Sequence, residues 1–224
     1  MRLALDRIDF DVVAFDLDGT LADTAPDLAA SLNHALGSVG RRGVPPDSVR
    51  NLVGHGAKAL LRRGLAVTGE ASEGLVEEAY PAFMDYYGAN ICAGTRIFPG
   101  VEQALDDLVA RGVTVAICTN KPESLTHLLL DALGWTSRFT AIIGGDTLAV
   151  RKPDPTPLFE TIARAGGGKA AFVGDSIIDA DTARAAKLPF VAVSFGFADR
   201  PIAQLGAHAV IDHYAELAGA LARL

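Results

Sequence analysis

The run Val12-Val13-Ala14-Phe15-Asp16-Leu17-Asp18-Gly19-Thr20 places four apolar residues directly before a pair of aspartates. A short, unbroken apolar run of this kind is typical of a strand that is covered on both faces of a parallel sheet. The aspartates fall where such a strand ends, and open parallel sheets bind their ligands at the carboxyl ends of their strands. The run therefore predicts a buried strand with a polar site at its end.

Similar apolar runs recur along the chain, each bounded by turn residues, at 113–118, 141–143, 170–173 and 190–193, with a weaker one at 209–211. Apolar residues with helical spacing separate most of these runs; Val101, Ala104, Leu105 and Leu108 are one example. Strands that alternate with helices are typical of α/β proteins. The pattern predicts a doubly wound parallel sheet.

The interval between the first two apolar runs interrupts this alternation. Its apolar residues show only helical spacing, and Val44-Pro45-Pro46 and Gly64 are expected to break the helices. We therefore predict two domains: an α/β catalytic core formed by residues 1–23 and 96–224, and a helical cap domain inserted at 24–95.

The chain has 224 residues with 20 Lys and Arg, 27 Asp and Glu, and a net charge of -7. Nucleic acids and anionic membranes select basic surfaces, so neither is expected as a partner. No apolar run approaches the ~18 residues that a membrane span needs, and the charged N-terminus leaves no room for the apolar segment of a signal peptide. We expect a cytoplasmic protein that is a monomer or a homodimer.

Polar clusters follow four of the expected strands. They are Asp16-Leu17-Asp18-Gly19-Thr20, Thr119-Asn120-Lys121-Pro122, Lys152-Pro153 and Gly174-Asp175-Ser176. Each alone has a simpler explanation: a turn, a strand-end hydroxyl, a surface lysine or a helix N-cap. In a parallel sheet, however, all four lie at the same edge, and a coincidence of four is improbable.

Together the clusters supply three carboxylates, a lysine and a hydroxyl. Carboxylates brought this close repel one another unless a hard cation lies among them, and a cation held by few carboxylates is typical of Mg²⁺. One carboxylate can then attack as a nucleophile, while a lysine and backbone N–H groups offset the charge of a phosphoryl group. The residue types therefore predict phosphoryl transfer.

In order and spacing, these clusters resemble the four motifs of the haloacid dehalogenase-like hydrolase superfamily. The motif residues are Asp16-Leu17-Asp18-Gly19-Thr20-Leu21, Thr119-Asn120, Lys152-Pro153, and Gly174-Asp175-Ser176 with Asp179. The resemblance covers essentially the whole chain, including a helical cap inserted after the first motif. Within the superfamily, the phosphoglycolate phosphatase branch is the most similar, on three stretches: Thr119-Asn120-Lys121-Pro122, Gly144-Gly145-Asp146-Thr147 and Arg151-Lys152-Pro153-Asp154-Pro155.

This resemblance implies the catalytic roles. Asp16 is the expected nucleophile, which forms an aspartyl-phosphate. Asp18 is the expected general acid for the leaving alcohol and then the base for the hydrolytic water. Thr119, Asn120 and Lys152 are expected to hold phosphate oxygens, and Lys152 also to restrain Asp16.

The resemblance also implies a metal site. Mg²⁺ is expected to bind the carboxylates of Asp16 and Asp175 and the backbone carbonyl of Asp18. Asp179 is expected to hold these ligands in place without binding the ion itself. Asp181 is nearby in sequence and is expected to be solvated.

Substrate selection is expected to reside in the helical cap. Gly54-His55-Gly56-Ala57-Lys58 resembles the cap loop that closes over the site in this branch. His55 and Lys58 are the candidate substrate contacts; the alternatives are an exposed loop histidine and a lysine on a solvated helix face.

The expected function is that of a Mg²⁺-dependent phosphatase for a small phosphate monoester, with 2-phosphoglycolate as the first candidate. Asp18 excludes the dehalogenases of the superfamily, which lack a carboxylate there. A phosphatase of sugar phosphates such as N-acetylmuramic acid 6-phosphate, or a phosphomutase, remains as an alternative. A non-catalytic binding protein would be marked by the loss of Asp16 or Asp18, and both are present.

Overall fold

The computed structural model describes residues 7–198 and 200–224, so residues 1–6 of the expected core lie outside the described part of the chain. A sheet of six parallel strands forms its centre, in the order β5-β4-β1-β6-β7-β8. The strands are β1 (Val12–Phe15), β4 (Thr114–Cys118), β5 (Ala141–Ile143), β6 (Ala170–Gly174), β7 (Phe190–Val193) and β8 (Ala209–Ile211). Each begins and ends within one residue of an apolar run in the sequence, and the expected doubly wound α/β fold is confirmed.

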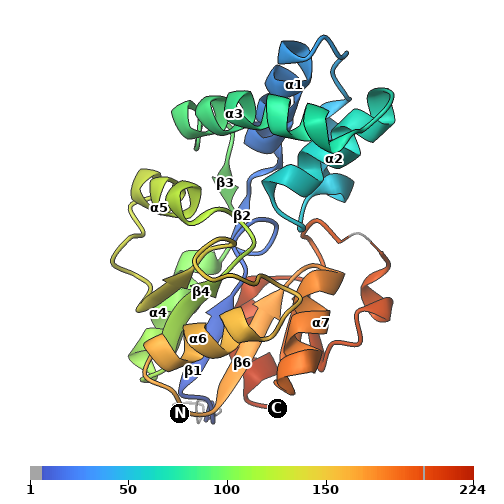
Figure 1. The fold of residues 1–224 in the computed structure, drawn as a ribbon. Coiled ribbons are helices and arrows are strands. Elements are labelled where there is room, and N and C mark those ends of the chain that lie inside the picture. The colour runs from blue at the N-terminus through green and yellow to red at the C-terminus, as the bar shows by residue number, and fades with distance from the viewer. Residues whose placement is uncertain (1–6, 199) are drawn as a thin grey trace.

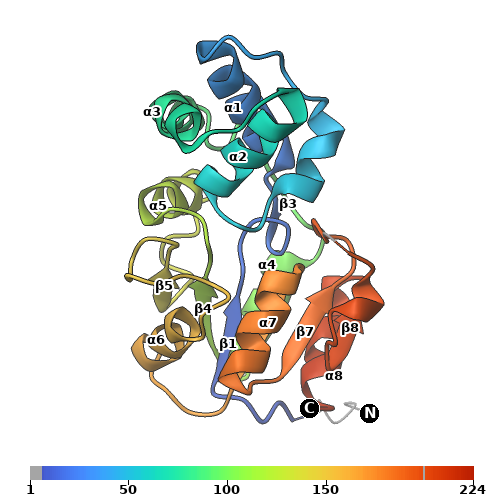
Figure 2. The same ribbon diagram turned by 45° about the vertical axis from the view of Figure 1, so that its right-hand side comes forward.

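Helices cover both faces of the sheet because successive side chains of a strand point to opposite faces. Val13 and Phe15 of β1 belong to the apolar core shared with α4 (Val101–Ala110), α5 (Glu123–Ala132) and α8 (Leu217–Leu221). Ala14 faces the opposite core, which contains residues of α6 (Thr156–Arg164) and α7 (Ile177–Ala186). Figure 2 shows α6 and α7 in front of the strands and α4 behind them. Two short 3₁₀ helices, η2 (Ile202–Gln204) and η3 (Tyr214–Glu216), complete the C-terminal part.

The helices within residues 25–89 form a second layer at the top of the molecule (Figure 1). They are α1 (Ala25–Ser38), η1 (Pro46–Leu52), α2 (Ala57–Thr68) and α3 (Glu73–Ala89), and they share a separate apolar cluster that includes Leu32, Leu61 and Phe83. Leu125 of α5 and Phe197 also join this cluster, so the second layer packs on the first. The division into a cap domain at 24–95 and a core stays a prediction.

The chain leaves and re-enters the α/β layer along a short antiparallel pair, β2 (Ala22–Asp23) and β3 (Arg96–Ile97). Asp27, in the first turn of α1, fastens this crossing: its carboxylate accepts hydrogen bonds from the backbone N–H groups of Gly94 (2.7 Å) and Thr95 (2.8 Å). The Thr95 hydroxyl donates a third (2.7 Å). One buried side chain thereby holds both connections of the inserted helices together.

The expectation that Gly64 breaks a helix is wrong. Gly64 lies inside α2, where a Cβ atom would come 2.7 Å from Cδ1 of Leu32 in α1. The absence of a side chain therefore lets α1 and α2 pack closely, at a helix cost of about 1 kcal/mol for a glycine. Among the described residues, none of the helices combines the length and apolar character that crossing a membrane requires.

Candidate active site

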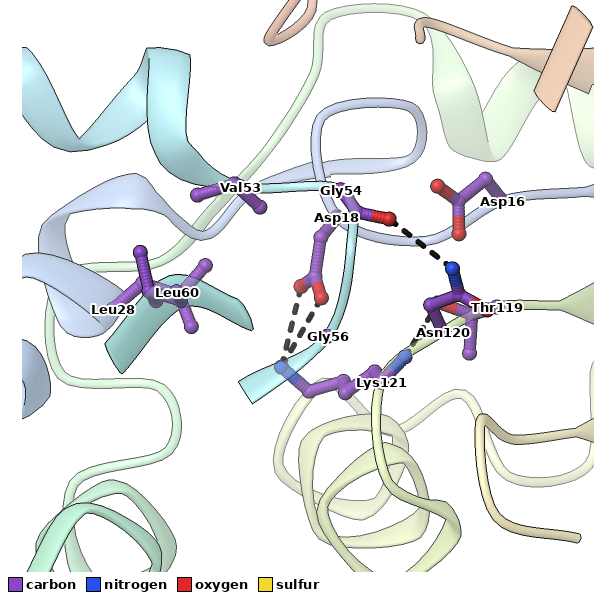
Figure 3. Close-up of a pocket in the computed structure, with 10 residues that line it drawn as sticks. All are labelled: Asp16, Asp18, Leu28, Val53, Gly54, Gly56, Leu60, Thr119, Asn120 and Lys121. Atoms are coloured by element: carbon purple, nitrogen blue, oxygen red, sulfur yellow. Dashed lines mark hydrogen bonds and ion pairs between the residues drawn. The ribbon is translucent and has the colours of Figure 1, made fainter. Parts of the chain in front are cut away.

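The carboxyl ends of β1 and β4 meet at a small cavity of about 30 Å³ beneath the inserted helices. β1 lies between β4 and β6. After β1 the chain first forms β4 and β5 on one side of it and then β6, β7 and β8 on the other side. Such a switch point leaves a crevice at the carboxyl edge, where open α/β sheets bind ligands. Figure 3 shows the lining residues: Asp16, Asp18, Leu28, Val53, Gly54, Gly56, Leu60, Thr119, Asn120 and Lys121.

Asp16 directly follows β1 and is only 5% exposed. Its Oδ1 accepts hydrogen bonds from the backbone N–H of Leu17 (2.8 Å) and lies 3.1 Å from Nζ of Lys152. Burial raises the pKa of Asp16 to about 6, although the nearby ammonium of Lys152 and the hydroxyl of Thr119 both act to lower it. Asp16 is therefore a carboxylate that the protein holds in one orientation and keeps from water.

Lys152 is buried between two carboxylates. Its Nζ lies 2.6 Å from Oδ1 of Asp179 and 3.1 Å from Oδ1 of Asp16. Burial by itself lowers the pKa of a lysine, but the charges of Asp16 and Asp179 outweigh burial and raise the pKa of Lys152 above its ordinary value. The ammonium is thus charged at neutral pH and fixed beside Asp16.

Asp179 owes its place to the N-terminus of α7. Ser176 is the N-cap, and its hydroxyl donates to Oδ2 of Asp179 at 2.6 Å. The same Oδ2 accepts from the backbone N–H groups of Ser176 (3.0 Å) and Asp175 (3.2 Å). Such a capping box satisfies N–H groups that a helix start leaves without partners. Both oxygens of Asp179 are therefore in use, one on the helix and one on Lys152.

Asp175 ends β6 and is held by residues far from it in sequence. The Thr20 hydroxyl donates to its Oδ1 (2.8 Å), and the backbone N–H of Phe197 donates to its Oδ2 (2.6 Å). Burial raises the pKa of Asp175 well above its ordinary value, and the charges of Asp179 and Asp16 raise it further. The carboxylate is therefore costly to ionise in the absence of a compensating positive charge.

These acidic residues form one cluster: Asp16, Asp175 and Asp179 each present an oxygen within 4.8 Å of the others. A buried cluster of this kind could hold a divalent cation, because oxygen ligands suit hard cations. Oδ2 of Asp179 accepts three hydrogen bonds and its Oδ1 lies 2.6 Å from the ammonium of Lys152, whereas each oxygen of Asp175 accepts only one hydrogen bond. Asp16 and Asp175 are therefore the carboxylates with more capacity left for a cation.

Asn120 joins the sheet edge to the inserted helices. Its Nδ2 donates to the backbone oxygens of Lys152 (3.0 Å) and Gly54 (3.2 Å), while its buried Oδ1 has no partner among the described residues. Gly56 comes equally close, because a Cβ atom there would lie 3.2 Å from the backbone oxygen of Asn120. The loop that contains Gly54 and Gly56 thus closes one side of the cavity.

Comparison with known proteins agrees with this geometry. Residues 13–193 match the family model described as haloacid dehalogenase-like hydrolase. The chain belongs to the haloacid dehalogenase-like hydrolases. It is 43% identical to a phosphoglycolate phosphatase of Agrobacterium fabrum over 92% of this chain and 90% of the relative. It is 44% identical to a phosphoglycolate phosphatase of Mesorhizobium japonicum over 94% of each.

Solved structures of the same haloacid dehalogenase-like fold are similar as well. A crystal structure described as a predicted phosphoglycolate phosphatase from Haemophilus somnus superimposes with a TM-score of 0.87 at 33% identity. The match covers 93% of this chain and 96% of that one, so it includes the inserted helices.

Two residues of this haloacid dehalogenase-like hydrolase that had no role in the sequence-based prediction, Lys121 and Tyr87, form a buried contact next to Asp18. Nζ of Lys121 lies 3.2 Å from Oδ1 of Asp18 and also donates to the hydroxyl of Tyr87 in α3. Burial lowers the pKa of Lys121, and the charge of Asp18 partly offsets this. The position of Lys121 after β4 was a usable signal; that of Tyr87 was not, because it depends on how the inserted helices pack.

Neither of the two candidate substrate contacts lines the cavity in the described structure of this hydrolase. Lys58 pairs with Glu77 (2.6 Å), lies over the ring of Tyr80, and has a 41% exposed side chain. His55 is half-buried in the loop between two glycines that do line the cavity. Asp181 pairs with Arg184 on a solvent-exposed part of α7.

Proposed function

We propose that this chain is a Mg²⁺-dependent phosphatase for a small phosphate monoester, with 2-phosphoglycolate as the first candidate. One observation carries the reaction class: Asp16 and Asp18, two residues apart, line the same cavity as Thr119 and Asn120. The candidate substrate is supported by the curated relatives, which are named phosphoglycolate phosphatase and cover nearly the whole chain.

In the first step of the proposed reaction, a carboxylate oxygen of Asp16 attacks phosphorus and the bond to the ester oxygen breaks. Asp18 gives a proton to that oxygen, so the leaving group departs as an alcohol. The hydroxyl of Thr119, the backbone N–H of Asn120 and the ammonium of Lys152 hold the phosphoryl oxygens, whose charge grows in the transition state. The product is an aspartyl-phosphate on Asp16.

The second step hydrolyses this intermediate. Asp18, now ionised, takes a proton from a water molecule, whose oxygen attacks phosphorus. The bond between phosphorus and Asp16 breaks, inorganic phosphate leaves, and Asp16 returns as a carboxylate. Asp18 ends the cycle protonated, ready for the next leaving group.

The metal proposal rests on the acidic cluster. Burial and the neighbouring carboxylates raise the pKa values of Asp16 and Asp175. A bound cation would offset this penalty on the charged carboxylates. Their carboxylates and the backbone carbonyl of Asp18 would hold Mg²⁺. When bound, the ion neutralises charge on the phosphoryl group and its nucleophile. Asp179 instead positions Lys152.

The inserted helices are proposed to act as a lid. The cavity of about 30 Å³ has room for about two water molecules, which is too little for a phosphate ester. We therefore propose that the loop around Gly54 and Gly56 moves away from Asn120 to admit substrate. His55 in that loop and Lys58 after it remain proposed substrate contacts, to be tested by His55→Ala and Lys58→Ala across several substrates.

A panel of phosphate esters assayed with Mg²⁺ tests the function. It contains 2-phosphoglycolate, several sugar phosphates including N-acetylmuramic acid 6-phosphate, and p-nitrophenyl phosphate. We expect release of inorganic phosphate, with the highest kcat/KM for 2-phosphoglycolate. A higher kcat/KM for a sugar phosphate would reject the substrate, and an isomerised product without phosphate release would reject the reaction.

A further inference from the structure

Lys121 carries the only positive charge among the described residues that line the cavity. Its side chain is 2% exposed, and Figure 3 shows its ammonium directed at Asp18. The neighbouring lining residues Leu28, Val53 and Leu60 are apolar. A substrate in this part of the cavity therefore meets one buried cation, which is paired with Asp18, and the apolar side chains that line the same cavity.

The ammonium of Lys121 has donor capacity to spare. A lysine has three N–H donors. Asp18 accepts from Lys121 at 3.2 Å, and the Tyr87 hydroxyl accepts a second hydrogen bond. Oδ2 of the same carboxylate also lies 3.5 Å from this nitrogen, so the two oxygens of Asp18 can share one N–H. Within the described part of the chain, the hydrogen bonds of this ammonium go only to Asp18 and Tyr87, which leaves one N–H for a ligand.

Tyr87 keeps this ammonium in place. Nζ of Lys121 lies 4.1 Å from the centroid of the Tyr87 ring, in addition to its bond to the hydroxyl. A lysine fixed in this way loses little further side-chain entropy when it binds a ligand. Its charge also acts in a site with little water, where electrostatic attraction is stronger.

The position of Lys121 defines which part of a substrate it can reach. In the proposed reaction, Asp18 hydrogen-bonds the ester oxygen, and Lys121 contacts that same carboxylate. Lys121 is therefore close to atoms that lie one or two bonds beyond the ester oxygen. In 2-phosphoglycolate, a carboxylate is joined to that oxygen by a single methylene group.

We propose that Lys121 is the receptor for an acidic group adjacent to the phosphate ester, and thereby selects phosphorylated small acids over neutral phosphate esters. The proposal rests on the phosphatase function above and deepens it. The apolar side chains of Leu28, Val53 and Leu60 in the same cavity add to the selection, because they offer no hydrogen bonds to the hydroxyl groups of a sugar.

The test compares 2-phosphoglycolate with 2-hydroxyethyl phosphate, in which a neutral alcohol replaces the carboxylate. The readout is the ratio of the two kcat/KM values. Hydrogen bonds to charged groups are worth enough that Lys121→Met should lower this ratio about 10- to 100-fold. Lys121→Arg keeps the charge and should retain part of the preference.

The ratio separates binding of the acid from effects on Asp18. Loss of Lys121 also removes a partner of Asp18, which lowers kcat/KM for both esters equally. An equal loss, with the ratio unchanged, would therefore overturn the proposal and leave Lys121 as a residue that only positions Asp18. Thermal unfolding of Lys121→Met checks that the variant is folded.

Arg151→Met is the matched control. Its guanidinium would lie 3.4 Å from a Cβ atom at Gly56, so it is a second cation near the cap loop, but it is exposed and does not line the cavity. We expect the ratio to stay at the wild-type value. A fall in the ratio for Arg151→Met but not for Lys121→Met would assign the acid to Arg151 and overturn the proposal.

A binding measurement separates the role of Lys121 as a receptor from the reaction itself. Calorimetry on Asp16→Asn should find tighter binding of 2-phosphoglycolate than of 2-hydroxyethyl phosphate, and this difference should vanish in Asp16→Asn with Lys121→Met. Phosphate release from none of the esters would refute the proposed function, while the calorimetry still decides the receptor. Equal binding of both esters to Asp16→Asn would overturn the receptor alone.

Discussion

The carboxylate of Asp179 binds both the ammonium of Lys152, which lies 2.6 Å from Oδ1, and the first turn of α7. Oδ2 of that carboxylate accepts three hydrogen bonds from the N-terminus of α7. The lysine next to Asp16 is therefore oriented by a helix start, and Asp179 links that helix start to the proposed nucleophile.

Asp179→Asn should lower both activity and stability. The amide cannot replace an anion opposite Lys152, and breaking a buried ion pair costs about 3–5 kcal/mol. Because the lysine then loses its orientation, kcat should fall about 10- to 100-fold, as is typical for residues that orient a site from behind. Urea unfolding and phosphate release measure the two effects.

Asp181→Asn is the control on the same helix. Its carboxylate pairs with Arg184 at the surface, and such exposed substitutions change stability by about 0.5 kcal/mol or less. If Asp179→Asn behaved like Asp181→Asn, the ion pair with Lys152 would have no role in orienting the site.

Mg²⁺ should stabilise the protein more at high pH than at low pH. Asp16 has a pKa of about 6 in the folded metal-free protein, against an ordinary value of 3.8. The folded state thus binds this proton more tightly, so the free energy of unfolding falls as pH rises between these values, by up to about 3 kcal/mol. Asp175 acts in the same direction.

A bound cation removes this penalty only where the carboxylates are ionised. The rise in Tm on adding Mg²⁺ should therefore be larger at about pH 8 than at about pH 5. An equal or larger rise at the lower pH, or full activity in excess EDTA, would contradict binding of the ion by Asp16 and Asp175.

Asp18→Asn should reduce activity in a way that depends on the leaving group. General acid catalysis is worth about 10²- to 10⁴-fold, so a substrate with an alkoxide leaving group should lose this much. With p-nitrophenyl phosphate, whose leaving group needs no proton, formation of the phosphoenzyme should suffer less than its hydrolysis. Pre-steady-state kinetics separate the two steps, and equal losses in both would count against a dual role for Asp18.

Gly56→Ala should impair closure of the lid. Gly56 has φ +87°, and an added Cβ would lie 3.2 Å from the backbone oxygen of Asn120. Misplacing the loop should lower kcat/KM about 10- to 100-fold. Gly40→Ala is the control: φ there is +70° with nothing within 4 Å of the added Cβ, so it should cost stability but not activity. If Gly56→Ala and Gly40→Ala had equal activity, the position of this loop would have no effect on catalysis.

Local patterns were sufficient to predict the sheet and the residues at its edge. The apolar runs around β1, β4 and β6 mark strands that are buried on both faces, and Asp16, Thr119 and Asp175 follow them directly. In a parallel sheet, the strand direction alone brings such residues together. The inserted helices were harder to predict. Gly64 was expected to end a helix, but it lies within α2 at a position where a side chain would clash with Leu32.

The partners of Asp18 could not be predicted from local patterns. Lys121 is 103 residues from Asp18 along the chain and 34 from Tyr87. In the sequence, Tyr87 fits the helical spacing of an ordinary core residue in α3. Only the packing of the inserted helices on the sheet edge brings its hydroxyl to the ammonium.

The central claim is that Asp16 carries the phosphoryl group. Rapid acid quench of the enzyme with 2-phosphoglycolate and Mg²⁺, followed by mass spectrometry of its peptides, tests this most directly. We expect one added phosphoryl group on Asp16, and neither this adduct nor turnover in Asp16→Asn, since an amide is a poor nucleophile of nearly the same shape. A phosphoryl group on a different side chain, or substantial turnover by Asp16→Asn, would contradict the account.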